Sequence, residues 1–332
     1  MSITKRTLAH YAYLVVCLTC LPCAQLGPAA AIAKPYIAVA NYSFGGLLRY
    51  DAKTGAFLDS IGSFPTPRSE LNLGPDGNFY VTIFSYSDDF QIHRINPKTG
   101  ASTLFIDATG LGSMRGLDFG PNGNLFVASS SRNAIMEFNG QTGEFIRDFI
   151  TGIRSPIDLD FAEDGTLYVA RGHHQISNPS SILRYNGQTG AFISTFATSN
   201  VDTPQNILVG TDGDVFVTNQ WTNAEPLVRF DGTTGAVKFA VSGGLANPQG
   251  LTFGVNGELL VASWDDTIKR FDASSGALLG NLVTGGVLSD PIGVIFIPEP
   301  SSRLLVAAAV ALFVPSRSRS ASLTARRPSV AR

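Results

Sequence analysis

A nine-residue sequence of the form RYNGQTGAF recurs six times in this 332-residue chain, and this repetition restricts the fold more than any other feature. A second motif, such as GPNGNLFVA from Gly120, recurs five times between these copies. A regular period of this kind predicts a repeat architecture in which each repeat is one supersecondary unit. The last Gly of each copy falls, at steps of 41 to 47 residues, at Gly55, Gly100, Gly143, Gly190, Gly235 and Gly276.

Both motifs are typical of β-hairpin turns. In the second motif, Asp-Gly or Asn-Gly stands between alternating apolar residues, because Gly accepts the positive φ that a tight hairpin requires. In the nine-residue motif, an Asp or Asn opens the turn and can hydrogen-bond its backbone, while the closing Gly suits a left-handed position that forms a bulge. In the third repeat we therefore expect strands at 116–120, 124–129, 134–138 and 144–150.

Four short antiparallel strands per repeat predict an all-β fold, a six-bladed β-propeller of four-stranded blades. The sixth copy of the second motif is divided between the two ends of the repeat region. Residues 291–296 match a first strand, and residues 36–41 match a second strand. We therefore expect the C-terminal strand to complete the N-terminal blade, which leaves no unpaired strand edge there. The alternative is five intact blades with frayed ends.

Residues 1–33 are expected to be a signal peptide rather than part of the fold. Lys5 and Arg6 precede an apolar stretch that is too short to cross a bilayer, which disfavours a membrane anchor. Ala31 and Ala33 then form an A-x-A site for signal peptidase. All three cysteines lie within this segment, and none follows the small-residue pattern of a lipidated cysteine. We therefore expect a secreted domain without disulfides.

Residues 298–332 combine a Pro-rich start, an apolar run and an arginine-rich end that prefers the cytoplasmic side of a membrane. The start is Pro298, Glu299 and Pro300, followed by two serines. This tail resembles the PEP-CTERM sorting signal, which in that bacterial family is read by a membrane protease-transpeptidase called exosortase. The resemblance implies location at the cell envelope or extracellular surface, only transient membrane contact, and a bacterium that makes exopolysaccharide. The alternative is a disordered terminus with a chance apolar patch.

Net charge argues against nucleic acid as a partner. The first 33 residues hold two of the 24 Lys and Arg, the last 32 hold six, and neither segment has an acid. The 26 acids and 16 remaining cations give residues 34–300 a net charge of about −10. An acidic domain without a basic stripe is a poor nucleic-acid binder.

The repeated phrase P-x-G-L-x-F-G-P-N-G-N-L-F-V-A, seen at 114–128 and 248–262, resembles the NHL, SMP-30/gluconolactonase and streptogramin-lyase group of six-bladed propellers. The resemblance covers residues 36–297 and implies the architecture, whereas one fold hosts many functions. Gluconolactonase-like members hold a divalent metal in the central channel with Glu, Asn and Asp side chains. The resemblance therefore implies an alternative function, a metal-dependent lactonase- or lyase-like enzyme with Ca²⁺ or another divalent cation.

Two columns of first-strand residues bear on this alternative. The second column offers Glu70, Asp158 and Asn206, whose side chains have the oxygen atoms that a divalent cation prefers. Alternation along a strand predicts that this column points away from the direction of the first. The first column has no carboxylate and cannot assemble an oxygen-rich cation site; it consists of Ser69, Arg115, Ile157, Gln205, Gln249 and Ile292.

Up-and-down blades place all the repeated turns on one face and the variable loops on the other, where binding commonly occurs. On this variable face, His173 and His174 could ligate a transition metal or simply be exposed. Trp264-Asp265-Asp266 could form a sugar platform or a cation site, or be a packed tryptophan beside a turn. The candidate ligand-binding residues of this face are Tyr86, Asp88, Asp89, His173, His174, Trp221, Trp264 and Asp265.

These features favour an exported, non-catalytic binding module at the cell surface or in an extracellular matrix, without a cofactor. The expected partners are a polysaccharide or a surface protein, together with signal peptidase and exosortase-type sorting machinery. A purely structural matrix protein is a third possibility.

Overall fold

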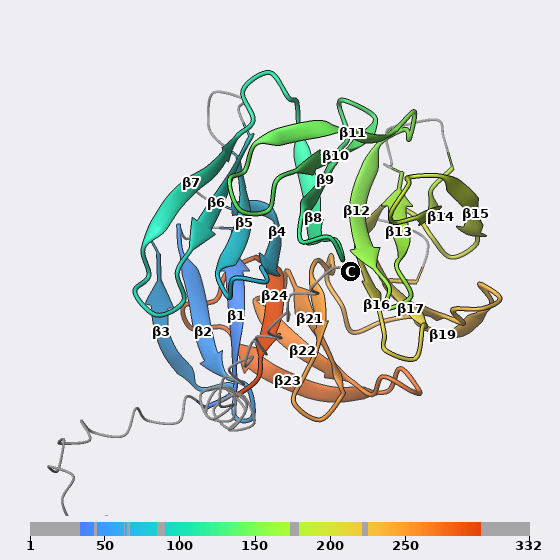
Figure 1. Cartoon of the computed structure of the whole chain (residues 1–332). Helices are drawn as coiled ribbons and strands as arrows, with labels where there is room; N and C mark the ends of the chain where they lie inside the picture. The colour runs from blue at the N-terminus through green and yellow to red at the C-terminus, as the bar shows by residue number, and fades with distance from the viewer. Residues whose placement is uncertain are drawn as a thin grey trace, which may run out of the picture. The chain divides into compact units, whose positions relative to one another are not determined.

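A computed structural model describes residues 34–299, apart from residues 43–44, 63, 65–66, 85–89, 173–178 and 221–224. In this part of the chain, 24 strands form six sheets of four antiparallel strands arranged in a ring (Figure 1). The described residues form no helix, and so none that is long and apolar enough to cross a membrane. The predicted six-bladed propeller is thereby confirmed.

The strands of each blade are given from the channel outward. Blade 1 contains β24 (Pro291–Ile297), β1 (Tyr36–Asn41), β2 (Leu47–Asp51) and β3 (Phe57–Ile61). Blade 2 contains β4 (Pro67–Leu73), β5 (Phe79–Phe84), β6 (Phe90–Ile95) and β7 (Ser102–Asp107). Blade 3 contains β8 (Met114–Phe119), β9 (Leu125–Ser129), β10 (Ala134–Phe138) and β11 (Phe145–Thr151). Blade 4 contains β12 (Pro156–Phe161), β13 (Thr166–Arg171), β14 (Ser181–Asn186) and β15 (Phe192–Ala197). Blade 5 contains β16 (Pro204–Val209), β17 (Val215–Asn219), β18 (Leu227–Phe230) and β19 (Val237–Val241). Blade 6 contains β20 (Leu251–Phe253), β21 (Leu259–Ser263), β22 (Thr267–Phe271) and β23 (Leu278–Thr284).

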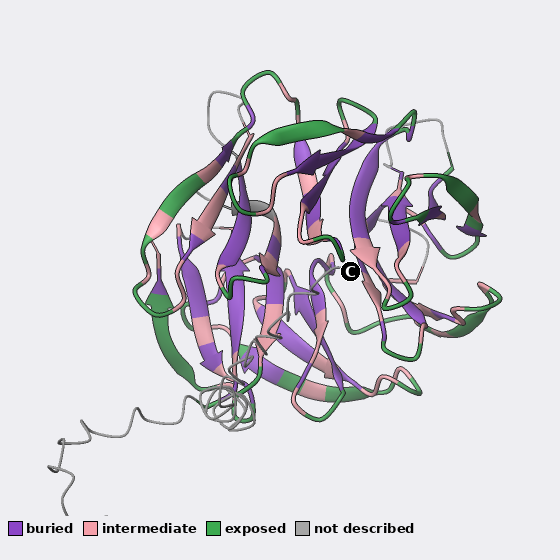
Figure 2. Ribbon diagram, viewed as in Figure 1, coloured by how far each residue is buried: buried purple, intermediate pink, exposed green. Residues whose placement is uncertain are grey.

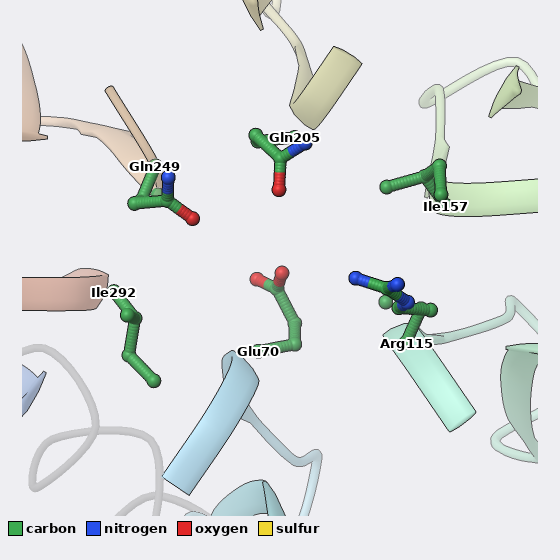
Figure 3. Close-up of a pocket in the computed structure, with 8 residues that line it drawn as sticks. Glu70, Arg115, Ile157, Gln205, Gln249 and Ile292 are labelled. Atoms are coloured by element: carbon green, nitrogen blue, oxygen red, sulfur yellow. The ribbon is translucent and has the colours of Figure 1, made fainter. Parts of the chain in front are cut away.

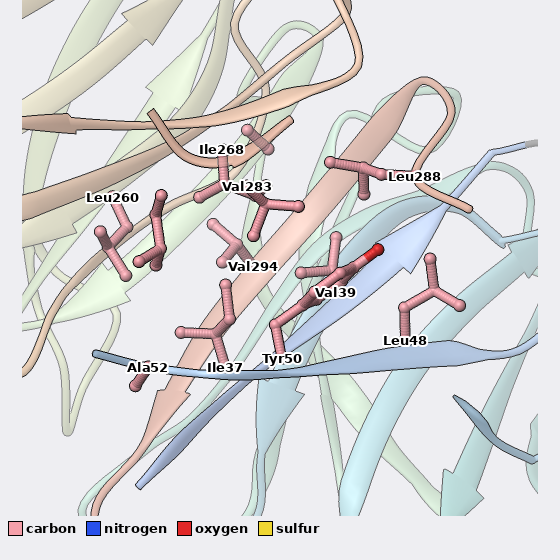
Figure 4. Packing of buried hydrophobic residues seen from close by; sticks show 12 residues of the cluster. Ile37, Val39, Leu48, Tyr50, Ala52, Leu260, Ile268, Val283, Leu288 and Val294 are labelled. Carbon is pink, nitrogen blue, oxygen red and sulfur yellow. The ribbon is translucent and has the colours of Figure 1, made fainter. Parts of the chain in front are cut away.

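Blade 1 closes the ring as the sequence predicts. β24 pairs antiparallel with β1, and the register places Val294 opposite Val39 and Phe296 opposite Ile37. Figure 4 shows Ile37, Val39 and Val294 packed against apolar side chains of blade 6. The last strand therefore contributes both a hydrogen-bonded ladder and part of a buried cluster to the seam.

Burial follows the order of strands from the channel outward (Figure 2). The middle strands β9 and β10 are buried at all five positions, whereas β11 is exposed over its first three residues. Aromatic side chains pack both within and between blades: the Tyr80 ring meets Phe105 of its own blade at 5.0 Å and Phe119 of blade 3 at 4.8 Å. Edge-to-face pairs of this kind contribute about 1 kcal/mol each beyond their buried area. The core is thus a set of apolar layers between successive blades.

The repeated nine-residue turns share one geometry. In blade 1, Asp51 Oδ1 accepts hydrogen bonds from the backbone N–H groups of Lys53 (3.0 Å) and Thr54 (2.9 Å), and the Gly55 N–H donates to the Asp51 carbonyl (2.8 Å). All six closing glycines have φ between 70° and 77°, the left-handed region that favours Gly. The same side-chain bonds are made by Asn96, Asn139, Asn186, Asp231 and Asp272.

The closing glycines also approach the preceding blade closely. A Cβ added to Gly190 would lie 2.8 Å from the carbonyl oxygen of Phe149 in blade 3. Gly77, in a turn between the first two strands of blade 2, has φ +75° but no atom within 4 Å of an added Cβ. The nine-residue motif is therefore repeated because each copy must both turn the chain and fit against the preceding blade.

This pair of glycines allows the two effects to be separated. We expect Gly77→Ala to lower the free energy of unfolding by about 1 kcal/mol, the cost of a left-handed alanine. We expect Gly190→Ala to cost about 2–4 kcal/mol, because the blade contact must also shift. Urea denaturation of both variants measures the difference, and equal losses would contradict the close-approach explanation.

Candidate functional site

Several first strands contain bulges beside the two columns of candidate residues. The register shifts between Pro156 and Asp158 in β12 and between Pro204 and Asn206 in β16. Comparable shifts occur in β4 and β8. A bulge adds one residue to a strand and redirects the neighbouring side chains. Glu70 of the second column lines the same cavity as five residues of the first column, so the prediction that the second column points away from the first is wrong for Glu70.

Residues of both columns line one small cavity in the channel (Figure 3). Its volume is about 20 Å³, which is enough for one water molecule. In Figure 3 the carboxylate of Glu70 points into the centre, facing the Arg115 guanidinium and the amides of Gln205 and Gln249. The remaining lining residues are Gly116, Ile157, Gly250 and Ile292.

The structure brings Glu70, Asp158 and Asn206 together. The Asn206 Nδ2 donates to Asp158 Oδ2 at 2.7 Å and to Glu70 Oε2 at 3.2 Å. The Asn206 Oδ1 accepts the backbone N–H of Leu251 at 3.0 Å. Because an N–H group can donate only to the oxygen end, this bond fixes the orientation of the amide.

A second polar layer lies beside these residues. Asp118 Oδ1 accepts from Asn72 Nδ2 at 3.0 Å, and Asp118 Oδ2 accepts the backbone N–H of Phe161 at 3.1 Å. Asp160 Oδ2 accepts the backbone N–H of Val209 at 2.6 Å. The sequence reasoning missed this layer. The signal was present, since these residues stand two positions after the second column and so share its face.

These side chains bind each blade to the next. The channel edge of every first strand carries backbone N–H groups that need partners. Asp158 Oδ2 accepts the N–H of Ile207 at 2.8 Å, so blade 4 satisfies an N–H of blade 5. Asp118, Asp160 and Asn206 make the same kind of bond to the blade that follows their own. Asp118, Asp158, Asp160 and Asn206 therefore stabilise the ring, because each joins its own blade to the next by a hydrogen bond.

Burial shifts the ionisation of this cluster. Desolvation, reinforced by the charge of Asp158, raises the pKa of Glu70 well above its ordinary value. Desolvation also raises the pKa of Asp158 to about 8, although hydrogen bonds from Ile207 and Leu159 act in the opposite direction. The pKa of Asp160 is raised well above its ordinary value by burial and by the charge of Asp118, whose own pKa burial also raises. Asp158, with a pKa of about 8, thus remains mostly protonated at pH 7.

A pH dependence of stability follows. The unfolded chain releases the protons of these carboxyls near their ordinary pKa, which is 3.8 for Asp158, but the folded state retains them. The stabilisation is complete below that value and is lost as the pH rises through the folded pKa of about 8. We expect the free energy of unfolding to be lower at pH 8.5 than at pH 5, by up to about 4 kcal/mol from Asp158 alone.

Urea denaturation at the two pH values measures this loss. Glu70→Gln removes one of the titrating groups, so it should flatten the profile. Stability that is unchanged or rises between pH 5 and pH 8.5 would show that these carboxyls are ionised in the folded state.

The three residues do not fit a cation site in this arrangement. Within residues 34–299, outside the gaps given above, no group of three or more Asp, Glu, His or Cys could hold a metal ion. Asn206 turns its amide nitrogen toward both carboxylates, while its oxygen is bonded to Leu251. A divalent cation would need that oxygen and the carboxylate lone pairs that now accept N–H groups.

Only part of the predicted loop face is described. Half-buried Trp264 has its ring 6.5 Å from that of Tyr42. Asp265 Oδ2 accepts from Lys269 Nζ at 2.6 Å, and its Oδ1 accepts from the Thr267 hydroxyl at 2.6 Å. The other candidate residues of this face lie outside the described part of the chain, namely Tyr86, Asp88, Asp89, His173, His174 and Trp221. So do the processing residues Ala31, Ala33 and Pro300.

No protein-family model and no curated protein sequence matches this chain. Among solved structures it is similar to the nidogen β-propeller of a nidogen/laminin complex, with a TM-score of 0.65, 16% identity, and coverage of 79% of this chain and 98% of that one. It is also similar to a candidate 6-phosphogluconolactonase from Bacteroides uniformis, with a TM-score of 0.56, 16% identity, and coverage of 80% and 99%. A chain of hydrazine synthase from Kuenenia stuttgartiensis gives a TM-score of 0.57, 16% identity, and coverage of 79% and 92%. At these identities the likeness establishes the β-propeller fold alone.

Proposed function

We propose that this propeller is an exported, non-catalytic binding module of the cell surface or extracellular matrix, which binds a polysaccharide or a surface protein through its faces. The observation that carries the proposal is the state of the channel. Its polar side chains are bonded to one another and to the next blade, and its cavity of about 20 Å³ admits one water molecule. Small-molecule sites are typically about 300–1,000 Å³.

Two further points support the proposal. Residues 1–33 have the pattern of a signal peptide, and residues 298–332 resemble a sorting tail for an exosortase-type enzyme. The similar nidogen propeller was solved in a complex with laminin, so this fold can carry a protein-binding surface.

Binding and hydrolysis can be tested on the same purified chain. We expect saturable binding to a bacterial polysaccharide on an array, or to an isolated surface protein, and no hydrolysis of sugar lactones. Absence of any saturable partner would leave the purely structural matrix role and overturn the proposal.

The runner-up is a metal-dependent lactonase- or lyase-like enzyme that uses Glu70, Asp158 and Asn206. The observation in its favour is that the ring brings these three residues within hydrogen-bond distance. The amide of Asn206 would have to turn before its oxygen could face a cation. Calorimetric titration with Ca²⁺ tests this function directly. Stoichiometric Ca²⁺ binding and lactone hydrolysis that are both lost in Glu70→Gln would establish the enzyme.

A further inference from the structure

A groove of about 680 Å³ lies outside the channel, at the junction of blades 2 and 3. It is formed by the repeated turns, on the face where the sequence reasoning did not place binding. Its polar lining comes from the turns of both blades and from β6. The polar residues are Asp76, Arg94, Asn122, Asn124, Asn139 and Gln141, and the rest are Pro75, Gly123 and Gly140.

Arg94 differs from its counterparts in blades 1 and 5. In blade 1, Arg49 forms a two-bond ion pair with Asp59 and donates to the Pro97 carbonyl of the next blade at 2.9 Å. In blade 5, Arg229 likewise pairs with two aspartates and donates to the Ala273 carbonyl at 2.7 Å. These bonds occupy the guanidinium groups of both arginines.

The sequence of blade 2 leaves Arg94 without an ion pair among the described residues. Thr103 stands opposite Arg94 in β7, where Asp59 stands opposite Arg49 in β3. The guanidinium lies 5.6 Å from the centre of the Phe105 ring, which supports it from one side. The nearby Asp76 carboxylate accepts from Asn78 and from the Tyr80 hydroxyl, and the charge of Arg94 helps to lower the pKa of Asp76. Arg94 also forms a side-chain hydrogen bond with Tyr80. Because a guanidinium has five N–H donors, Arg94 retains donors for a ligand beyond its bond to Tyr80.

Blade 3 contributes two amides of fixed orientation. Glu137 occupies the third-strand position at which the other five blades have an arginine. It is buried, and its Oε2 is bonded to Arg147 at 2.7 Å. Glu137 Oε1 accepts from Asn122 Nδ2 at 3.1 Å and from Asn124 Nδ2 at 2.8 Å. Burial acts to raise the pKa of Glu137, but the bonds from Asn124 and Arg147 outweigh it and hold the pKa below its ordinary value. This ionised carboxylate positions both amides beneath the groove.

The lining favours one class of ligand. Side-chain amides both donate and accept hydrogen bonds, as sugar hydroxyls do, and a guanidinium binds a carboxylate through two parallel bonds. A bound peptide commonly needs apolar pockets or an unpaired strand edge, and the groove has no large apolar residue in its lining. We infer that this groove binds an acidic saccharide, with Arg94 on a sugar carboxylate and the amides of blade 3 on its hydroxyls. This inference rests on the proposed binding function and names its site and ligand class.

The chain supplies a matched control for the test. Blades 3 and 4 carry the same NGQTG turn, so Gln141 and Gln188 are equivalent. Gln188, however, lies at the junction of blades 3 and 4. There the preceding blade has Glu137 at the position that Arg94 holds in blade 2. Gln141 and Gln188 are both exposed, and replacing either by alanine should leave the fold intact.

Calorimetric titration of the purified chain with a hexamer of galacturonic acid tests the inference. We expect binding that weakens as salt concentration rises, because the carboxylate contact is screened. Arg94→Gln should weaken it at least tenfold and Gln141→Ala measurably, whereas Gln188→Ala should leave it unchanged. Maltohexaose, which lacks carboxylates, should bind at least tenfold more weakly.

Several results would overturn the inference. Equal losses in Gln141→Ala and Gln188→Ala would place the saccharide elsewhere. Hexaglutamate that binds through Arg94 while the oligouronate does not would give the groove a peptide ligand. Binding of a polysaccharide or surface protein that Arg94→Gln does not affect would sustain the proposed function but not this site. Lack of any partner would overturn both.

Discussion

A chain that stops at Asp290 is expected to lose the native ring, whereas a chain that stops at Glu299 should unfold as cooperatively as the full chain. The shorter chain lacks β24, the only partner of β1 on the channel side. It would expose the edge of β1 and open the buried clusters that contain Ile292 and Val294. Each such buried side chain contributes about 1.5–3 kcal/mol, so these two alone account for about 3–6 kcal/mol before the ladder is counted.

Circular dichroism during urea denaturation measures this difference. The chain ending at Glu299 retains every strand and is the matched control. A synthetic peptide of residues 291–298 added to the shorter chain should restore a cooperative transition. An unaltered midpoint in the chain ending at Asp290 would mean that the closing strand does not hold the ring.

Asn206→Ala is expected to lower the free energy of unfolding by about 3–5 kcal/mol, because one side chain serves three partners. Its amide nitrogen bonds Asp158 and Glu70, and its oxygen bonds the N–H of Leu251 in blade 6. Alanine would leave two enclosed carboxyls and one backbone N–H without these bonds. The carboxyls would take up protons more readily, so the loss should be smaller at pH 5 than at pH 8.5.

Asn281→Ala provides the comparison, since Asn281 is exposed and its amide bonds only the Thr284 hydroxyl at 3.3 Å among the described residues. A change within about 0.5 kcal/mol is expected there. Thermal and urea denaturation of the two variants at both pH values complete the test. A loss below about 1 kcal/mol for Asn206→Ala would show that these channel bonds are not needed to join the blades.

Most of the fold could be predicted because its information is local. Each Asp-Gly or Asn-Gly turn depends on a few neighbouring residues, and the predicted strands of the third repeat agree with β8 to β11 within two residues. The closure of the ring was predictable for a different reason. Residues 291–296 and 36–41 each match one part of a repeat, and together they make the repeat complete.

The channel could be predicted only in part. The sequence identified Glu70, Asp158 and Asn206, but simple alternation directed them away from the first column because it ignored the bulges in the first strands. A bulge depends on how two strands pair, which one strand does not reveal. The groove was missed because it depends on contacts between blades. A comparison of the third strands would have signalled it, since Glu137 stands alone in a column of arginines.

The pairing of β1 with β24 joins residues more than 250 positions apart, and it has a consequence for biogenesis. A ribosome must complete nearly the whole repeat region before the first blade can obtain its inner strand. Contacts between such distant residues slow folding, because the loop must close before the contact stabilises it. The export proposed above would therefore carry a polypeptide whose ring has not yet closed. Pairing of β1 with β24 would then follow translocation.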